Sequence, residues 1–383
     1  MKIGLFSDTF EPQVNGVVSV IKTLVNGLPQ RGHEVFVCTV AHPAARQSNN
    51  VLRLASIPFP WEKQHRFGLP FVHNMLARIR ELELDVIHSH TPFTMGVLAN
   101  MASRRLSIPC LHTYHTLFEE YFHYLPMGAL LKRLIPRLSK KYCNNQRAMI
   151  APSRKMQRLL HGYEVSVPIH VVPNGIDLGA FMEQAPTPSE TQQFRSALNI
   201  QPDERAVIYV GRIAQEKSVE ALLRNFVHVA AADSSTKLLL VGDGPERAHI
   251  ARLSAQLGIH QRVVFTGYLK WPTEIALAYK SSDVFVSASH TEIHPIVYIE
   301  ALASGLPVVS YRDPSIEEMV IDDENGYTFA NKQHLHQGIT KILADERTRQ
   351  RMAKRSIEIA EAYTAEIFAD RMSDIYEMYG RKQ

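Results

Sequence analysis

Residues 283–311 read DVFVSASHTEIHPIVYIEALASGLPVVSY, a stretch that predicts a strand, a loop, a helix and a second strand in that order. The apolar runs at its two ends are short and continuous, as in parallel strands that are covered on both faces. Between them, Glu292 lies in the predicted loop and Glu300 in a helix that should begin near Ile296. Ligands of such sheets bind beyond the carboxyl ends of the strands, where helix N-termini attract anions. The stretch therefore predicts a doubly wound α/β fold with a ligand site in this loop.

The same alternation of strand and helix extends along the whole 383-residue chain. Further strands are predicted at 2–7, 34–40 and 85–90 in the first half, and at 205–211, 237–244 and 262–268 in the second. The polar stretch QAPTPSETQQF (184–194) holds two prolines and predicts a boundary loop before a new helix. We therefore predict two doubly wound, Rossmann-like domains that face each other across a cleft. The predicted domains are residues 1–178 and 179–363, with a helix at about 364–383 that can pack back on the first.

The composition excludes several classes of protein. Gly 19 and Pro 21 are ordinary counts for this length, which excludes collagen-like and low-complexity chains. No run approaches the roughly 18 apolar residues of a membrane-crossing helix, and the opening MKIGLFSDTF predicts a strand rather than a signal peptide. The three cysteines show neither disulfide nor zinc spacing, which favours a reducing, cytosolic location. The histidine pairs His88/His90 and His112/His115 lack a Cys or carboxylate at ligand spacing, so we expect no metal site.

Charge is distributed unevenly along the chain. Residues 1–180 hold 20 Lys and Arg against 11 Asp and Glu, a balance of +9, whereas residues 181–383 hold 22 against 27, a balance of −5. A basic half can face phosphates, nucleic acid or an anionic membrane. No nucleic-acid recognition motif accompanies the charge, so nucleic acid is not an expected partner.

The basic charge is concentrated in a predicted helix within 128–147, which interleaves leucines with Lys and Arg. Aromatic residues beside two basic ones lie upstream, at 59–71. Such a helix either lies on an anionic membrane or presents an ordinary solvated face, and we favour the membrane. Pro136 is expected to kink or split the helix. The predicted membrane contacts are Trp61, Lys132, Arg133, Arg137, Lys140 and Lys141.

A second constellation, VGRIAQEK (210–217), joins a predicted strand to a helix. Arg212 offers a fork of donors to phosphate oxygens, and Lys217 adds a flexible positive charge. Two basic residues before a helix often belong to a solvated face, but opposite the two glutamates they predict a diphosphate clamp. At the front of the chain, Asn15-Gly16 predicts a turn with close backbone approach. The sequence lacks both the dinucleotide fingerprint and the P-loop pattern.

The stretch PCLHTYHTLFEEYFHYLP (109–126) adds a histidine to the candidate site. His115 directly follows a predicted strand, where an imidazole can donate a hydrogen bond to a sugar hydroxyl or exchange a proton. His112 is predicted to lie still within the strand, and we interpret it as structural.

Together these motifs resemble the retaining glycosyltransferases of family four, which have the GT-B fold. The resemblance runs from Met1 to the last helix, and its most specific marks are Glu292-x7-Glu300 with EALASGLPVV, VGR…EK, VVPNGID (171–177) and VGDGPE (241–246). The front end, FSDTFEPQVNGVVSVI, and HTYHTLFEEYFHYLP are similar to bacterial diacylglycerol glucosyltransferases. The resemblance implies transfer of a hexose to a lipid such as diacylglycerol or a glycolipid. The expected hexose is glucose, and the expected donor is UDP-glucose. It also implies a cytoplasmic protein attached peripherally to the inner face of the plasma membrane.

The resemblance further implies catalytic and donor-binding roles for the matching residues. Arg212 and Lys217 would hold the donor diphosphate and stabilise charge on the leaving group. Glu292 would lie beside the donor sugar, and His115 would contact a sugar hydroxyl. Glu300 would accept hydrogen bonds from the ribose hydroxyls. Neither a metal nor a bound cofactor is expected, because Arg, Lys and helix N-termini neutralise the diphosphate and the nucleotide sugar is a co-substrate.

One position departs from the family pattern. The family usually has Gly three residues after the first glutamate, whereas this chain has Pro295, which lacks the N–H that would face the donor. His294 beside it could supply a replacement donor of hydrogen bonds. Ile296 at the helix start and Gly16 at the first turn complete the expected donor-binding set.

Two other interpretations remain open. One is a transferase with a soluble or polysaccharide acceptor, in which the basic helix is merely solvated. The other is a catalytically silent GT-B subunit that positions a partner enzyme. Pro295 argues for the silent subunit, whereas the intact set of Arg212, Lys217, Glu292 and Glu300 argues against it.

Overall fold

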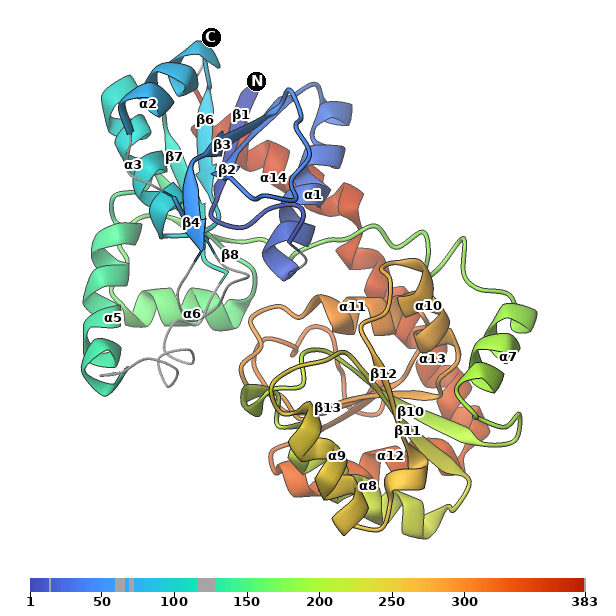
Figure 1. Cartoon of the computed structure of the whole chain (residues 1–383). Helices are drawn as coiled ribbons and strands as arrows, with labels where there is room; N and C mark the ends of the chain where they lie inside the picture. The colour runs from blue at the N-terminus through green and yellow to red at the C-terminus, as the bar shows by residue number, and fades with distance from the viewer. Residues whose placement is uncertain (14, 59–65, 69–71, 116–127, 382–383) are drawn as a thin grey trace. The chain divides into compact units, whose positions relative to one another are not determined.

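The chain folds into two compact units, shown in the computed structural model of Figure 1. The N-terminal unit is Met1–Ile176 together with Ala365–Gln383, and the C-terminal unit is Asp177–Thr364. The chain therefore passes twice between the units, and its last helix belongs to the first of them. The residues that the structure describes are 1–13, 15–58, 66–68, 72–115 and 128–381.

The N-terminal unit is built on a seven-stranded sheet in the order β3-β2-β1-β6-β7-β8-β9, with parallel pairing throughout. Its strands are β1 (Lys2–Ser7), β2 (Glu34–Val40), β3 (Val51–Leu54), β6 (Val86–Ser89), β7 (Cys110–Thr113), β8 (Ala148–Ala151) and β9 (Ile169–Val171). A separate antiparallel pair joins β4 (Ser56–Pro58) to β5 (Arg66–Gly68). The helices described in this unit are α1 (Gly16–Gly27), α2 (Val72–Glu81), α3 (Thr94–Leu106), α5 (Gly128–Cys143), α6 (Arg154–Gly162) and α14 (Ala365–Tyr379).

The last helix, α14, is part of this unit because it packs against α1; Figure 1 shows the red helix beside the blue one. Arg31 Nε donates a hydrogen bond to Asp370 Oδ1 at 2.6 Å. The ring nitrogen Nε2 of His33 lies 2.7 Å from Ser373 Oγ, in a buried contact. The predicted C-terminal helix is thus present, and side chains from the start of the chain hold it.

Helix α5 bears on the expectation that Pro136 kinks or splits the basic helix. It is a single helix from Gly128 to Cys143 with Pro136 inside it, so the proline does not split the basic segment. A proline removes one backbone hydrogen bond and crowds the preceding turn. Ile135 and Cys143 are buried, so the helix packs against its unit on both sides of the proline.

The C-terminal unit has a six-stranded sheet in the order β12-β11-β10-β13-β14-β15, again with parallel pairing throughout. Its strands are β10 (Arg205–Val210), β11 (Thr236–Val241), β12 (Val263–Gly267), β13 (Val284–Ser287), β14 (Val308–Tyr311) and β15 (Gly326–Phe329). Its helices are α7 (Pro188–Ala197), α8 (Val219–Ala232), α9 (Arg247–Gln256), α10 (Thr273–Lys280), α11 (Ile296–Ala303), α12 (Leu335–Ala344) and α13 (Glu346–Ala360). Thr187 begins α7 with a reciprocal capping box to Glu190, at the predicted boundary.

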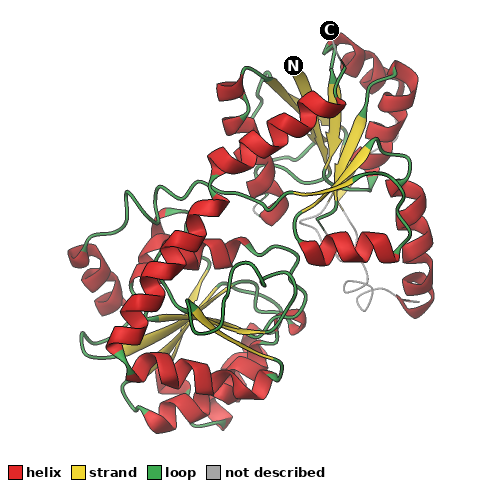
Figure 2. Ribbon diagram, turned by 180° about the vertical axis from the view of Figure 1, so that it is seen from behind, coloured by secondary structure: helices red, strands yellow, loops and turns green. Residues whose placement is uncertain are grey.

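Both sheets are doubly wound, and Figure 2 shows helices on both faces of each. The strand order changes direction between β1 and β6 in the first sheet and between β10 and β13 in the second. Ligands of such sheets bind at this switch point, beyond the carboxyl ends of the strands. The predicted α/β class and its two Rossmann-like domains are therefore confirmed. Along the described residues, no helix is both long and apolar enough to cross a bilayer.

Candidate functional site

The turns that follow β10 and β11 approach each other closely, which is possible because glycines occupy the points of contact. Gly211 and Gly242 have φ of +154° and +126°, which L side chains rarely adopt. A Cβ on Gly242 would lie 2.1 Å from the Gly211 carbonyl oxygen, and a Cβ on Gly244 would lie 2.3 Å from that of Ile213. Backbone groups therefore line this end of the sheet, and side chains are kept out of the turn.

Lys217 and Glu292 form an ion pair at the β10/β13 switch point, with 2.6 Å between Nζ and Oε1. Lys217 comes from the short turn between β10 and α8, and Glu292 from the loop between β13 and α11. Their side chains are 25% and 12% exposed. Arg212 follows β10 and is exposed, and its carbonyl accepts a hydrogen bond from Tyr209 at 2.9 Å. The Lys217–Glu292 pair and Arg212 thus all come from segments that follow β10 or β13, at the switch point of this sheet.

Glu300 lies inside α11 and is only 4% exposed. Trp271 Nε1 donates to its Oε1 at 2.8 Å, and Tyr279 Oη lies 3.1 Å from its Oε2. Burial raises the pKa of this carboxyl to about 7, although both hydrogen bonds oppose the shift. Tyr279 also donates to the Val297 carbonyl at 3.0 Å. A tyrosine has one proton to donate, so a protonated Glu300 can donate to the Tyr279 oxygen while Tyr279 donates to Val297.

The residues before α11 differ in what they offer a ligand. Pro295 is the N-cap of α11, with extended backbone, and Ile296 is the first helical residue. His294 is buried, and its ring lies 5.5 Å from that of Tyr363. Burial lowers the pKa of His294 to about 3, so the imidazole is neutral. Its Nδ1 is buried and has no hydrogen-bond partner among the described residues.

Three residues of this region carry no signal in the sequence. Trp271 and Tyr279 hold Glu300, yet they come from the segment that leads into and through α10. Lys332 donates to Ser218 Oγ and contacts His290 Nδ1, each at 2.8 Å, and so ties the turn after Lys217 to the loop before Glu292. No sequence spacing connects Lys332, which follows β15, with the segment around Lys217 or the loop before Glu292, because only the folded unit brings these segments together.

The switch point of the N-terminal unit carries polar groups from β1 and β6. Asp8 accepts from Thr91 Oγ1 at 2.6 Å and from the Met95 amide at 3.1 Å, at the start of α3, and burial raises its pKa. Gly16 opens α1 and is exposed. Asn15 caps that helix, because its Oδ1 accepts from the Val18 amide at 3.0 Å.

His115 lies directly after β7, in a cluster with three other histidines. Its Nε2 is 3.0 Å from His90 Nδ1, and it is partly exposed whereas His88, His90 and His112 are buried. Burial lowers the pKa of His112 and of His115 to about 3, and those of the other two well below the usual value. Among the described residues, no group of His, Cys, Asp and Glu side chains is arranged to hold a metal ion.

The predicted membrane contacts are described in part. Arg137 and Lys141 are exposed on α5, beside Leu134 and Leu138, of which Leu138 is 62% exposed. Lys140 is paired with Glu164, with 2.5 Å between Nζ and Oε2. Trp61 and the side chains of Lys132 and Arg133 lie outside the described residues.

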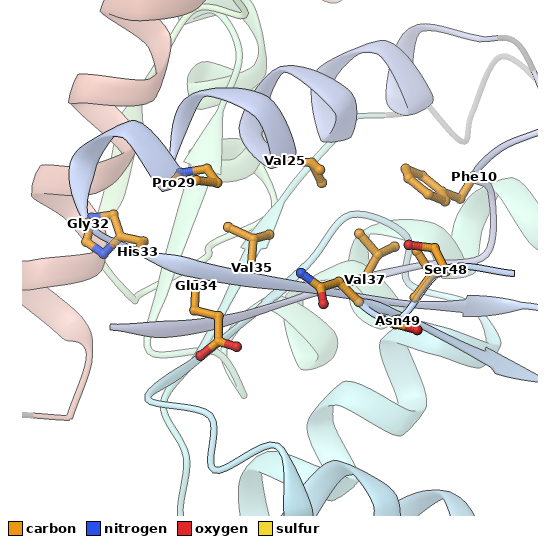
Figure 3. Close-up of a pocket in the computed structure, with 12 residues that line it drawn as sticks. Phe10, Val25, Pro29, Gly32, His33, Glu34, Val35, Val37, Ser48 and Asn49 are labelled. Carbon is orange, nitrogen blue, oxygen red and sulfur yellow. The ribbon is translucent and has the colours of Figure 1, made fainter.

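A surface pocket of about 640 Å³ runs along the flank of β2 in the N-terminal unit (Figure 3). Val25 and Pro29 lie on one side of it, Val35 and Val37 on the other, and Phe10 at one end. It contains none of the predicted site residues. The pocket therefore does not identify the predicted site.

Two parallel-sheet Rossmann-like units in one chain are the architecture of the GT-B glycosyltransferases. Residues 14–180 match the family described as Glycosyltransferase Family 4, and residues 190–359 match Glycosyl transferases group 1. The chain belongs to glycosyltransferase family 4.

Relatives and solved structures agree with this assignment. The chain is 33% identical to the alpha-monoglucosyldiacylglycerol synthase of Streptococcus pneumoniae, covering 98% of this chain and 85% of that protein. It is 31% identical to the protein of the same name from Acholeplasma laidlawii, covering 98% and 96%. A GDP-mannose-dependent alpha-mannosyltransferase of Mycolicibacterium smegmatis is 27% identical, covering 100% and 99%. The crystal structure of Anabaena Alr3699/HepE in complex with UDP and glucose has a TM-score of 0.80 at 19% identity, covering 99% and 100%.

Proposed function

We propose that the protein is a retaining glucosyltransferase that moves glucose from UDP-glucose to diacylglycerol or a related glycolipid at a membrane surface. The observation that carries the proposal is the Lys217–Glu292 ion pair beside the exposed Arg212, at the switch point of the C-terminal unit. The lipid acceptor and the glucosyl group rest on the two relatives named as alpha-monoglucosyldiacylglycerol synthases. Uridine as the donor base rests on the family resemblance.

In the proposed reaction the acceptor hydroxyl oxygen bonds to C1 of glucose while the bond from C1 to the diphosphate oxygen breaks. The hydroxyl proton passes to the departing phosphate oxygen on the same face, so the configuration at C1 is kept and UDP leaves. Negative charge grows on the diphosphate as that bond breaks, and Arg212 and Lys217 stabilise it. Their two positive charges do the neutralising in a reaction that we propose needs no metal.

Donor binding uses the same region. Glu300 accepts hydrogen bonds from the two ribose hydroxyls. Glu292 lies beside the glucose, and its ion pair with Lys217 orients the side chains of both Glu292 and Lys217 before the donor binds. The start of α11 at Ile296 gives the diphosphate a helix N-terminus. Pro295 removes one N–H from that end, and we propose that the unpartnered Nδ1 of buried His294, the preceding residue, supplies a replacement polar contact.

Acceptor binding and membrane attachment belong to the N-terminal unit. His115 donates to a hexose hydroxyl, and Gly16 admits the backbone of the first turn to the diphosphate or the acceptor. Arg137 and Lys141, exposed beside Leu138, give α5 both charge and apolar surface for an anionic bilayer. The protein then acts as a cytoplasmic, peripheral enzyme of the inner face of the plasma membrane.

Calorimetric titration of the full chain with UDP, GDP and ADP tests the donor. Binding of UDP well ahead of the other two supports the proposal. Preference for GDP would argue against UDP-glucose and for a GDP-sugar donor, like that of the mannosyltransferase relatives. Binding of none of the three nucleotides would favour a catalytically silent subunit.

Transfer of labelled glucose to diacylglycerol in anionic vesicles then tests the site and the acceptor. Lys217→Ala should lower the transfer rate on the order of 100-fold or more, as loss of one group that stabilises transition-state charge does. Lys341→Ala is the matched control, because Lys341 also forms an ion pair in the C-terminal unit, with Asp323 at 3.3 Å, and should keep the wild-type rate. Equal rates in both variants would refute the site, and transfer to soluble sugars alone would refute the lipid acceptor.

A further inference from the structure

The two pairs of histidines that lack metal spacing meet at the carboxyl ends of β6 and β7. The rings of His88 and His90 have centroids 4.1 Å apart, and those of His90 and His115 are stacked at 5.2 Å with planes 20° apart. His90 is buried, and its Nδ1 lies 3.0 Å from Nε2 of His115. His90 therefore contacts the one residue of this cluster to which the proposed function gives a role.

The contact between the two rings constrains their protons. A neutral imidazole carries one proton on one of its two nitrogens, so exactly one ring of a hydrogen-bonded neutral pair donates. Burial keeps both rings neutral at physiological pH. Either His90 donates from Nδ1 to His115 Nε2, or His115 donates from Nε2 to His90 Nδ1.

The other nitrogen of His90 selects between these arrangements. Its Nε2 is buried and has no hydrogen-bond partner among the described residues. If His115 donated, this Nε2 would carry a buried N–H without an acceptor, and unpaired buried N–H groups are rarer in proteins than unpaired acceptors. If His90 donates, its Nε2 is a bare nitrogen lone pair, which is the smaller loss.

We propose that His90 is a positioning residue that donates from Nδ1 to His115 Nε2 and thereby keeps the proton of His115 on Nδ1. The proposal deepens the function proposed above, because it says which nitrogen of His115 can donate to the hexose. With Nε2 occupied as an acceptor, Nδ1–H is the group that His115 can offer to an oxygen of the sugar.

His90 itself is held by its surroundings. The ring of His88 packs against it, and His88 is fixed at both nitrogens, by Tyr376 Oη and by Thr113 Oγ1, each at 2.7 Å. Tyr376 belongs to α14, so the C-terminal helix supports the ring that His90 packs on. A ring positioned in this way loses little freedom when substrate binds, which is the condition for accurate placement of a polar contact.

Nuclear magnetic resonance of the full chain with 15N-labelled histidine tests the tautomer without any substrate. The shifts of the two ring nitrogens show which of them carries the proton, and the His115 signals are assigned by their loss in His115→Gln. We expect His115 to be protonated on Nδ1 in the wild type and to change toward Nε2 in His90→Ala. A wild-type His115 with its proton on Nε2 would overturn the proposal.

Kinetics of glucosyl transfer test the consequence. His90→Ala should lower kcat roughly 10–100-fold with a smaller change in KM, similar to the loss of an outer hydrogen-bond partner of a metal-bound histidine. His90→Asn keeps an N–H near the place of Nδ1 and should restore most of the rate. His112→Ala removes another buried imidazole, one bonded to Ser89 Oγ instead of His115, and is the matched control.

The outcomes distinguish failure of the positioning role of His90 from failure of the proposed function. An Asn variant as slow as the Ala variant, or a His112→Ala loss as large as that of His90→Ala, would count against positioning through the hydrogen bond. If the wild type transfers no glucose at all, the proposed function fails, whereas the tautomer of His115 is still decided by the resonance measurement.

Discussion

At the scale of single residues, the proposed binding of the donor ribose by Glu300 predicts that donor affinity depends on pH. The raised pKa of Glu300, about 7 in the free protein, means that it is substantially protonated at neutral pH, and only the ionised form accepts from both ribose hydroxyls. UDP-glucose has no phosphate group that titrates near this pH. Its affinity should therefore fall as the pH is lowered from 8 to 6, by about tenfold at most for each unit below the pKa. Calorimetry across this range measures it, and Glu300→Gln should bind weakly with little pH dependence.

The same carboxyl makes an opposite prediction for stability. Because its pKa in the folded protein lies above the ordinary value of 4.5, its contribution to folding is fully present below pH 4.5 and is lost as the pH rises through about 7. The loss is on the order of 3 kcal/mol for a shift of this size. Glu300→Gln should thus unfold at higher urea concentration than the wild type at pH 8, even though it binds donor less well. A less stable Gln variant at pH 8 would show that the buried carboxylate is not strained.

At the scale of elements, the turn after β11 depends on the absence of a side chain. Gly242→Ala places a Cβ 2.1 Å from the Gly211 carbonyl oxygen at a φ of +126°, so both turns must move. We expect a loss of roughly 1–3 kcal/mol in the free energy of unfolding and a clear loss of donor affinity. Gly258→Ala is the control, because it also has positive φ (+72°) but no atom within 4 Å of the added Cβ. Equal donor affinity in both variants would show that the close approach of the turns is unimportant.

Helix α5 is the element that should hold the protein on anionic lipid. Arg137 and Lys141 are both exposed on it, and each basic side chain near such a surface contributes about 1 kcal/mol. Replacing both with Ala should weaken binding to anionic vesicles roughly 30-fold, with a smaller effect in high salt. Replacing the exposed Arg252 and Lys354 of the C-terminal unit in the same way should leave flotation unchanged. A similar loss in both double variants would indicate general charge attraction and no dedicated membrane face.

The sequence predicted elements well where apolar runs are continuous. β1 and β2 have the predicted bounds because each is a run of six or seven residues that the sheet buries almost throughout. β15, with the sequence GYTF, was not predicted, because a short segment that begins with glycine has no strand pattern of its own. It is placed by pairing with β14 and by packing against α12. Pro136 was expected to kink or split its helix; the helix is not split, and it carries buried residues on both sides of the proline, Ile135 and Cys143.

The candidate site was predictable to the extent that its residues follow strands. Lys217 and Glu292 lie after β10 and β13, which are neighbours in the sheet, so their contact follows from topology. Trp271 and Lys332 could not be predicted, because each reaches the site from an element whose position only the packed unit determines. The raised pKa of Glu300 could not be predicted either, because the burial that causes it depends on how the unit packs.

At the scale of the whole molecule, the two ends of the chain meet in one unit, and α14 closes it. Tyr376→Phe removes the partner of buried His88 Nδ1, at 2.7 Å, and an unsatisfied buried group costs about 1–3 kcal/mol. Tyr379→Phe is the matched change on the same helix, since its 2.8 Å contact with His170 is only partly buried and water can replace it. Hydrogen exchange should therefore become faster in α14 and β6 in the first variant and change little in the second. Equal exchange in both would mean that the Tyr376–His88 contact contributes little to holding α14. Faster exchange confined to the first would mean that the end of the chain is fixed through the same histidines that place His115.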